Sequence, residues 1–297
     1  MLYSISDLEQ LSGIQSHTIR AWEQRYNALK PMRTEGNTRF YDDSQLKKLL
    51  NIVMLNQSGL KISKICSLSD SDLLKMLDAY ITLAPEKPKF DYFVTQLIKS
   101  GLAYDEYAFD KLLTACIDKF GMSDAYRYIM YQVLVRLGLM WQKDNICPAQ
   151  EHYLANIIKR KIFKAIDELP LKENSKETWL LFLPEDEEHD IGLLFSHYIL
   201  RANNKKVIFL GARVPLTSIK KVLLENKIDS LLFFMVGIRY KKTAQKYLDD
   251  LQAIGADTKI NIAGNTHLLN QLTMSENVTI FNTLEDFERI IKKPEIL

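Results

Sequence analysis

The sequence predicts a multi-domain protein of mixed α and α/β class: a small helical segment, a four-helix bundle and a doubly wound parallel sheet. Three observations support this prediction. The length of 297 residues suits about two domains of roughly 150 residues. The stretch APEKPKF at residues 84–90 has two prolines and suits an extended linker. Later, short apolar runs alternate with amphipathic stretches, which indicates strands joined by crossover helices. The expected boundaries are 1–75, a linker at 76–89, the bundle at 90–172 and the sheet domain at 173–297.

The composition is that of a globular protein, with 47% hydrophobic and 26% charged residues, which excludes a disordered or fibrous chain. The 39 basic and 37 acidic side chains give a net charge of +2, so any affinity for nucleic acid must come from a local patch. Cys66, Cys116 and Cys147 lack CxxC spacing, which argues against disulfides and a Cys-based zinc site. No apolar run reaches the roughly 18 to 20 residues that span a bilayer, and the start lacks a signal-peptide layout. We therefore expect a cytoplasmic protein without a membrane partner.

The N-terminal segment has the pattern of a helix-turn-helix. A short amphipathic helix over residues 4–12 is followed by a turn at Gly13 and a second helix over about 16–25. In this motif the second helix enters the major groove of DNA. From spacing alone, a small helical domain with a solvated basic hairpin is about as good a reading. Both readings predict two short helices joined by a tight turn.

A basic hairpin follows the two helices. A turn at Gly36-Asn37 predicts a two-stranded wing that would hold arginines beside phosphates. Residues 15–48 contain seven basic and four acidic side chains, a local excess of 7 − 4 = 3. That modest excess suits contact with the DNA backbone.

A family resemblance is carried by residues 19–46, IRAWEQRYNALKPMRTEGNTRFYDDSQL. This string resembles the winged helix-turn-helix of MerR-family transcription regulators, and its RAWEQRY part most resembles the light- or cobalamin-responsive CarH/LitR type. The resemblance implies binding to a double-stranded DNA operator. Members usually dimerise through a long coiled-coil helix, but no heptad run follows Leu60, so we expect dimer contacts elsewhere. The implied DNA-binding residues are His17 and Arg20 on the recognition helix, with Arg33, Arg39 and Tyr41 serving the wing and the phosphates.

The middle of the chain is helical throughout, which is typical of an antiparallel four-helix bundle. A loop between the last two helices can bring Trp141 and the pair Glu151-His152 to one end of the bundle. Spacing alone favours a simpler interpretation, in which Trp141 belongs to the core and the pair to a polar helix face. The helices are expected near 90–100, 104–119, 123–140 and 148–168, with breaks at Ser100-Gly101, Gly121 and residues 142–147.

The C-terminal segment predicts a Rossmann-like sheet, whose ligands bind at the carboxyl ends of the strands. The expected strands are 179–183, 207–210, 231–236, 260–263 and 278–281, and the expected helices are 190–203, 215–226, 241–253, 266–272 and 284–292.

The loop after the first expected strand carries a histidine two residues after a glutamate. Neutral imidazole is the commonest metal-ligating side chain, and the carboxylate of Glu187 could hold the second ring nitrogen of His189. A histidine on an acidic loop is more often a solvated surface residue. One histidine with its carboxylate cannot build a closed protein metal site. The pair could supply one axial ligand to a metal that a macrocycle already holds.

Three motifs of this segment resemble those of cobalamin-binding domains. They are Glu187-x-His189-x-x-Gly192, then Leu210-Gly211 with Pro215, then Ser230-x-Leu232. The resemblance implies that His189 is the lower cobalt ligand oriented by Glu187, that Gly192 allows close approach of the corrin, and that Ser230 and Leu232 line the slot of the displaced nucleotide tail. The family usually has Gly-Gly after the fourth strand, where this sequence has Gly264-Asn265.

The bundle also carries a motif of the CarH type. Trp141 with Glu151-His152 fits its W-x9-E-H spacing, although the usual glycine of the intervening loop is Asp144 here. The resemblance implies that the bundle caps the upper face of the corrin. Trp141 and Glu151 would shelter an adenosyl group, and His152 could take the upper cobalt position after light breaks the cobalt–carbon bond.

The leading hypothesis is a non-enzymatic transcription repressor controlled by adenosylcobalamin and light through its oligomeric state, as a homodimer or homotetramer. A second hypothesis keeps the MerR-type DNA binding but replaces adenosylcobalamin by another corrinoid, or by none, without photochemistry. A third is a corrinoid-carrying component of a methyltransferase. The winged helix-turn-helix and the lack of a further substrate domain argue against the third.

Overall fold

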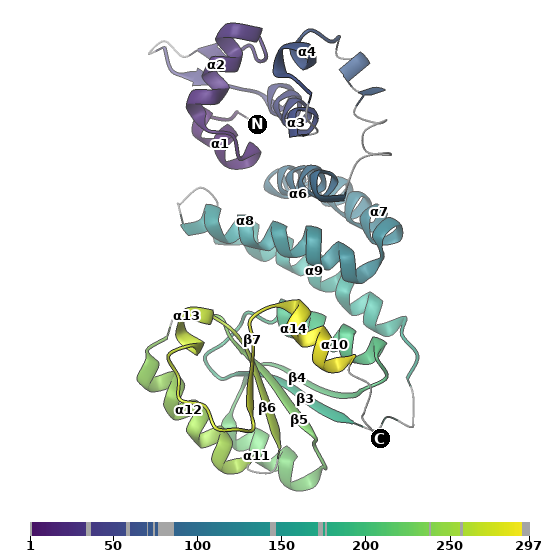
Figure 1. The fold of residues 1–297 in the computed structure, drawn as a ribbon, viewed down its shortest axis with the longest axis vertical. Coiled ribbons are helices and arrows are strands. Elements are labelled where there is room, and N and C mark those ends of the chain that lie inside the picture. Colours follow the sequence, from purple (N-terminus) through teal and green to yellow (C-terminus); the bar gives the residue numbers. More distant parts are fainter. Residues whose placement is uncertain are drawn as a thin grey trace. The chain divides into compact units, whose positions relative to one another are not determined.

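The computed structural model divides into two compact units, residues 1–157 and 158–297 (Figure 1). Among the described helices, none combines the length and the apolar character that crossing a membrane requires. The structure describes residues 2–33, 37–57, 60–69, 71–73, 75–76, 86–142, 147–171, 175, 177–237, 239–255 and 258–292.

The first unit begins with the predicted helix-turn-helix and wing. In the first helix the Ser4 hydroxyl accepts from the Asp7 N–H and the Asp7 carboxylate accepts from the Ser4 N–H, which satisfies two free donors of the first turn. The helix ends at Gly13, whose φ of 71° lies in the left-handed region that glycine favours. The elements are α1 (Ile5–Ser12), α2 (Ser16–Tyr26), β1 (Met32–Arg33), β2 (Arg39–Phe40), α3 (Asp43–Gln57) and α4 (Ile62–Cys66).

The four expected helices of the bundle are present, with two differences. The first begins at Glu86 rather than near residue 90, because a proline in the first turn has no intrahelical hydrogen bond to lose; residues 77–85 lie outside the described part. The expected break at Gly121 is a kink inside one helix, with φ 78°, and a π-helical turn follows. The elements are α6 (Glu86–Leu102), α7 (Glu106–Ala125), η1 (Tyr126–Met130), α8 (Tyr131–Gln142) and α9 (Pro148–Asp167).

The second unit confirms the predicted doubly wound sheet. Its five strands are all parallel and lie in the order β4-β3-β5-β6-β7. The strand β4 is thus added on one side of β3, and β5 and the later strands are added on the other side. The strand order therefore reverses between β3 and β5. The strands are β3 (Thr178–Pro184), β4 (Lys206–Val214), β5 (Ser230–Met235), β6 (Lys259–Gly264) and β7 (Val278–Phe281). The helices are α10 (Ile191–Ala202), α11 (Leu216–Glu225), α12 (Lys241–Ile254), α13 (Thr266–Leu269) and α14 (Leu284–Ile291).

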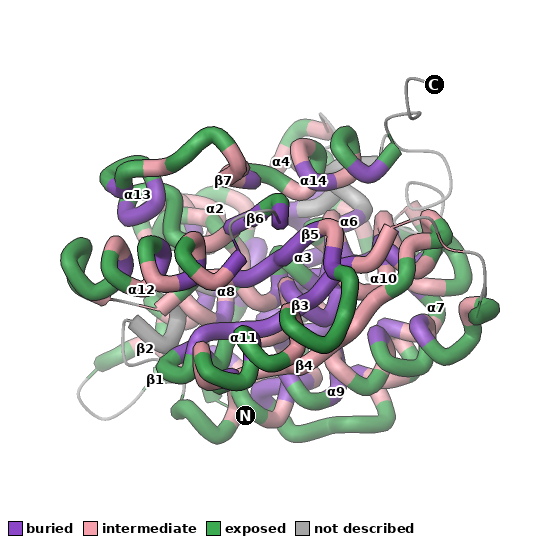
Figure 2. The backbone as a smooth tube through the Cα atoms, turned by 90° about the horizontal axis from the view of Figure 1, so that it is seen from below, coloured by how far each residue is buried: buried purple, intermediate pink, exposed green. Residues whose placement is uncertain are grey.

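Helices cover both faces of this sheet. One face carries α11 and α12, and the other carries α10 and α14 (Figure 1). Alternate residues of a strand point to opposite faces, so Leu180 and Phe182 of β3 join Leu231 and Phe233 of β5 in the core beneath α12. Figure 2 shows the central strands β3 and β5 as buried, whereas the edge strand β4 is mostly of intermediate exposure.

Candidate functional site

Two loops meet at the point where the strand order reverses. The loop at residues 185–190 leaves the carboxyl end of β3, and the loop at 236–240 leaves the carboxyl end of its neighbour β5. Ligands of open parallel sheets bind outside the carboxyl ends of the strands at such a reversal. The expected site residues Glu187 and His189 both lie in the first of these loops.

A buried carboxylate holds one ring nitrogen of an exposed histidine. Oε1 of Glu187 lies 2.5 Å from Nδ1 of His189. The side chain of Glu187 is 1% exposed, and that of His189 is 62% exposed. An ionised carboxylate can only accept, so Nδ1 of His189 is the donor. In a neutral imidazole this leaves Nε2 without a proton, which is the tautomer of a metal-ligating histidine.

The two oxygens of Glu187 have separate partners. Oε1 also accepts from the backbone N–H groups of Glu188 and His189, at 3.1 and 3.3 Å. Oε2 accepts from the N–H groups of Val236 and Gly237, each at 2.8 Å, and from the guanidinium of Arg239 at 3.1 Å. Burial by itself raises the pKa of Glu187, but the hydrogen bonds from the imidazole of His189 and from the backbone N–H groups of Gly237, Val236 and His189 outweigh it and lower the pKa to about 2. The carboxylate is therefore ionised at any ordinary pH.

The other residues of the first two motifs serve the backbone. At Gly192 an added Cβ would lie 2.9 Å from the ring of Phe234, so the glycine allows α10 to pack on β5. The corrin contact that the resemblance implies for Gly192 stays a prediction. Gly211 lies inside β4 rather than in a loop after it, and its φ of 81° accompanies a register shift between β3 and β4.

The residues expected at the tail slot lie on β5 and at the end of β6. Ser230 and Leu232 are both 1% exposed. Gly264 has a φ of 137°, and a Cβ there would lie 2.0 Å from the carbonyl oxygen of Met235, so no other residue fits. Asn265 caps α13, since its side chain accepts from the Leu268 N–H at 3.2 Å.

The expected upper-face residues belong to the first unit. Glu151 is half-buried and His152 is exposed, in the first turn of α9. Trp141 lies in α8, but its side chain and Asp144 are outside what the structure describes. Nearby, the Tyr153 hydroxyl donates to the carbonyl of Tyr104 at 3.3 Å, which joins α9 to the turn between α6 and α7.

The recognition helix α2 presents the expected side chains. His17 and Arg20 are exposed, whereas Ile19 between them is fully buried. Arg33 of the wing is exposed and donates to Oδ1 of Asn37 at 2.5 Å. Asn37 has the left-handed φ of 61° that the predicted turn requires, while Gly36 lies outside the described residues.

Two of the expected wing residues are bound to an acidic residue of the second helix. Tyr41 is 0% exposed, and its hydroxyl donates to the carboxylate of Glu23 on α2. Nε of Arg39 donates to the same carboxylate at 3.1 Å. Glu23 therefore binds both side chains, of which Tyr41 is buried and Arg39 stays 24% exposed, so that the phosphate contact remains a prediction for Arg39 in particular. Their role here is to fasten β2 to the recognition helix.

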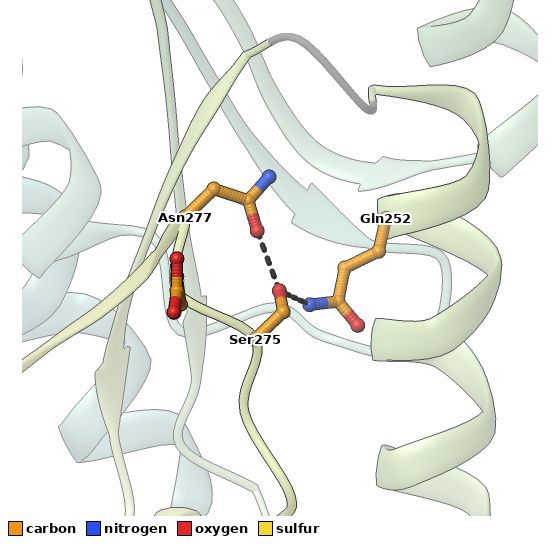
Figure 3. Close-up of a pocket in the computed structure, with 4 residues that line it drawn as sticks. Gln252, Ser275 and Asn277 are labelled. Atoms are coloured by element: carbon orange, nitrogen blue, oxygen red, sulfur yellow. Dashed lines mark hydrogen bonds between the residues drawn. The ribbon is translucent and has the colours of Figure 1, made fainter.

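Two further features narrow the search for a site. In the described part of the chain, no three His, Cys, Asp or Glu side chains gather as a metal site. A shallow, open hollow is lined by Gln252, Ser275 and Asn277, whose side chains are hydrogen-bonded to one another (Figure 3). It lies at the amino end of β7, away from the ligand-binding edge.

Sequence reasoning missed Arg239 and Glu23. The loop after β5 was expected to carry ligand contacts, and an arginine in it was a visible signal. Glu23 stands inside the WEQR string, among residues expected to read DNA, and nothing in its spacing shows that it is buried.

Comparison with known families finds two matches in this chain. Residues 3–71 match the model described as MerR HTH family regulatory protein, and residues 94–164 match the one described as B12 binding domain. The first match confirms the MerR-type resemblance of the N-terminal segment, and the second assigns a B12-binding resemblance to the helical bundle.

Two transcriptional repressors match this chain over most of its length. The chain is 25% identical over 294 residues to the HTH-type transcriptional repressor CarH of Myxococcus xanthus, covering 97% of each protein. It is 22% identical over 268 residues to the repressor CarA of the same organism, covering 89% of this chain and 87% of CarA. A solved monomethylamine corrinoid protein of Methanosarcina barkeri is 12% identical, with a TM-score of 0.51 over 67% of this chain and 96% of that one, which shows a shared fold.

Proposed function

We propose that this chain is a DNA-binding transcription regulator controlled by cobalamin, and not an enzyme. The observation that carries the cobalamin half is the buried carboxylate of Glu187 on Nδ1 of the exposed His189, at the reversal of the strand order. Its wing and recognition helix support the DNA-binding half, together with the resemblance to two transcriptional repressors.

The residues at the site fit a cobalt corrinoid. A corrin already supplies the equatorial ligands, so the protein needs to add only one nitrogen from below. His189 has that nitrogen in Nε2, and its other nitrogen is held by a carboxylate, as in most metal-ligating histidines. Ser230, Leu232, Gly192, Gly211 and Gly264 remain the proposed surroundings of the nucleotide tail and the corrin.

We infer that the bound form is adenosylcobalamin and that light is the signal. When bound, this group would supply a cobalt–carbon bond that green light breaks. Trp141 and Glu151 are proposed to shelter the adenosyl group, and His152 to serve as the upper cobalt ligand once that group has left. The protein supplies ligation and shape, while the photochemistry belongs to the cofactor.

The proposed readout is the oligomeric state. Adenosylcobalamin would favour a larger homo-oligomer, a dimer or tetramer, that binds its operator through several recognition helices at once. Light would remove contacts that distinguish the two states, which is what a shift of population requires. Separated subunits bind DNA weakly because avidity is lost. The protein would therefore act as a repressor in the dark.

The first experiment is gel filtration with absorbance detection of the purified protein mixed with adenosylcobalamin, in the dark and after green light. Co-elution of cobalamin in a large dark species that shrinks on illumination is the expected result. Methylcobalamin and hydroxocobalamin in parallel runs distinguish the upper ligand. If none of the three co-elutes, the cobalt role of His189 is wrong.

Matched histidine variants assign the ligands. His189→Ala is expected to weaken cobalamin retention, whereas His267→Ala, which changes an exposed side chain of α13, should retain it. His152→Ala should bind cobalamin in the dark and change only the spectrum after illumination. DNA binding is measured in the same samples by selection from a random duplex pool, since a chain that never enriches a sequence would not be a regulator.

A further inference from the structure

The loop after β5 places a buried arginine on the carboxylate that holds His189. The side chain of Arg239 is 6% exposed. One of its terminal nitrogens lies 3.1 Å from Oε2 of Glu187 and 3.1 Å from Oδ1 of Asp186. The arginine therefore joins the loop after β5 to the loop after β3, across the reversal of the strand order.

The stability of the fold alone does not account for the buried ion pair between Arg239 and Glu187. Within the described residues, the buried Nε–H of Arg239 has no acceptor. Burying a guanidinium with an unpaired donor is expensive, and a buried ion pair often stabilises a fold less than apolar side chains of similar volume would. The arrangement suits a residue that sets the position of a neighbour.

The contacts of Glu187 show which position is set. Arg239 and two backbone N–H groups occupy Oε2. Oε1 is the oxygen that meets the imidazole of His189. With one oxygen fixed from the side of β5, the carboxylate cannot turn out of this orientation without breaking three hydrogen bonds. Its other oxygen therefore stays directed at Nδ1 of His189.

We propose that Arg239 is a positioning residue for His189: by holding Oε2 of Glu187, it keeps the imidazole in the tautomer whose Nε2 can ligate cobalt. This inference rests on the proposed cobalamin binding for its cobalt part only. The hold on the tautomer is a property of the protein without any ligand, and it is measured separately.

The test uses the whole chain labelled with ¹⁵N-histidine. Nitrogen NMR of the ligand-free protein reports whether Nδ1 or Nε2 of His189 carries the proton. Wild type and Arg239→Lys, which keeps the charge, should give the Nδ1-protonated form, whereas Arg239→Gln should give a mixture. The matched control is Arg213→Gln. Arg213 of β4 forms an ion pair with Glu188, which lies in the same loop as Glu187, but both of these side chains are exposed, at 66% and 57%.

The second readout is the electron paramagnetic resonance of bound cob(II)alamin. A nitrogen ligand from labelled histidine splits the cobalt lines into doublets, which distinguishes it from the unlabelled nucleotide base. Arg239→Gln is expected to weaken ligation by His189 by roughly 10-fold, the lower end of typical losses when a partner of a metal ligand is removed. Arg213→Gln and Arg239→Lys should retain the doublets.

The outcomes separate the two proposals. If wild type binds no cobalamin, the proposed function fails, while the NMR result still decides whether Arg239 orients His189. If Arg239→Gln keeps the wild-type tautomer and the doublets, the inference about Arg239 is overturned. Arg239→Met is a second neutral variant that fills the same space. If both neutral variants unfold while Arg239→Lys folds, Arg239 serves the fold and the inference is also overturned.

Discussion

The hydroxyl of Tyr41 donates a hydrogen bond to the carboxylate of Glu23, and this bond ties the wing to the recognition helix. Arg39 donates to the same carboxylate at 3.1 Å, and Glu23 is 6% exposed. The orientation of the wing is therefore set by a buried acid on the helix that would read DNA. Binding energy gained at either element depends on the other.

Tyr41→Phe is expected to lower the free energy of unfolding by about 1.5 to 3 kcal/mol, because it removes a hydrogen bond to a buried charged group. Denaturant unfolding of the apo protein measures this. Tyr107→Phe makes the same chemical change on an exposed side chain of the same unit and should stay within about 0.5 kcal/mol of wild type. Equal stabilities of wild type and Tyr41→Phe would contradict the role of this bond.

Substitutions of the exposed Arg20 and Arg33 should affect DNA binding in different ways. Arg20→Ala is expected to cost about 1 to 3 kcal/mol and to relax the sequence preference, as for a residue that reads a base. Arg33→Ala should weaken all sequences alike and reduce the slope of log K against log salt by about 1, as for a phosphate contact. The slope is measured by titration of a selected duplex. Unchanged slopes for Arg33→Ala would place the wing off the backbone.

His197 should make the protein less stable in mild acid. The ring of His197 stacks on Phe209. Its pKa falls from 6.5 to about 4, mainly because the ring is buried. The charge of Arg201 lowers the pKa further, while that of Asp167 raises it. The unfolded chain therefore binds a proton first. Stability is complete above pH 6.5 and falls as the pH drops toward 4, by on the order of 2 kcal/mol for this part-exposed ring. His197→Phe should flatten that interval of the curve, and the exposed His267→Phe should leave it unchanged.

Glu187 should act in a more acidic interval. Its pKa of about 2 lies below the ordinary 4.5, so its contribution is present above pH 4.5 and is lost as the pH falls toward 2. Glu187→Gln is expected to lose on the order of 3 kcal/mol at neutral pH and to flatten the curve below pH 4.5. The exposed Glu188→Gln is the control. Urea unfolding at a series of pH values measures the stability of each variant. Equal curves for Glu187→Gln and Glu188→Gln would contradict the prediction.

The Gly264-Asn265 pair should respond very unequally to substitution. Gly264→Ala would collide with the Met235 carbonyl and force a left-handed φ, which should cost at least about 3 kcal/mol. Asn265→Gly restores the family's usual pair and removes only the cap of α13, so it should cost a few tenths of a kcal/mol. Calorimetry compares them. Similar losses for both would mean that the cap matters more than the backbone at Gly264.

Periodicity predicted the elements because each helix and strand buries its own face. The five strands and the alternating helices agree with the expected ranges within a few residues, except that β4 continues through Gly211 to Val214. That extension depends on a register shift against β3, which is a pairing property and leaves no mark in the sequence of one strand.

The site was predictable where a motif fixes a local geometry. Glu187 and His189 are two residues apart, so their contact needs only one loop. Arg239 lies 52 residues from Glu187, and Tyr41 lies 18 from Glu23, so these pairs meet only after strands have paired or the wing has folded back. The burial of Tyr41 against Glu23 is a long-range contact of this kind, and the spacing of the sequence did not indicate it.

The π-helical turn η1 between α7 and α8 has a consequence for insertions and deletions. A wider turn takes one extra residue, and each residue of an α-helix advances it by about 100° around its axis. The extra residue of η1 therefore sets which side chains of α8 face the bundle, among them the fully buried Val133 and Leu137. Shortening η1 by one residue would rotate those two side chains out of the bundle and bring the exposed Tyr131 and Val135 round toward it. The orientation of α8 about its own axis should therefore tolerate substitutions in η1 far better than a change in the length of η1.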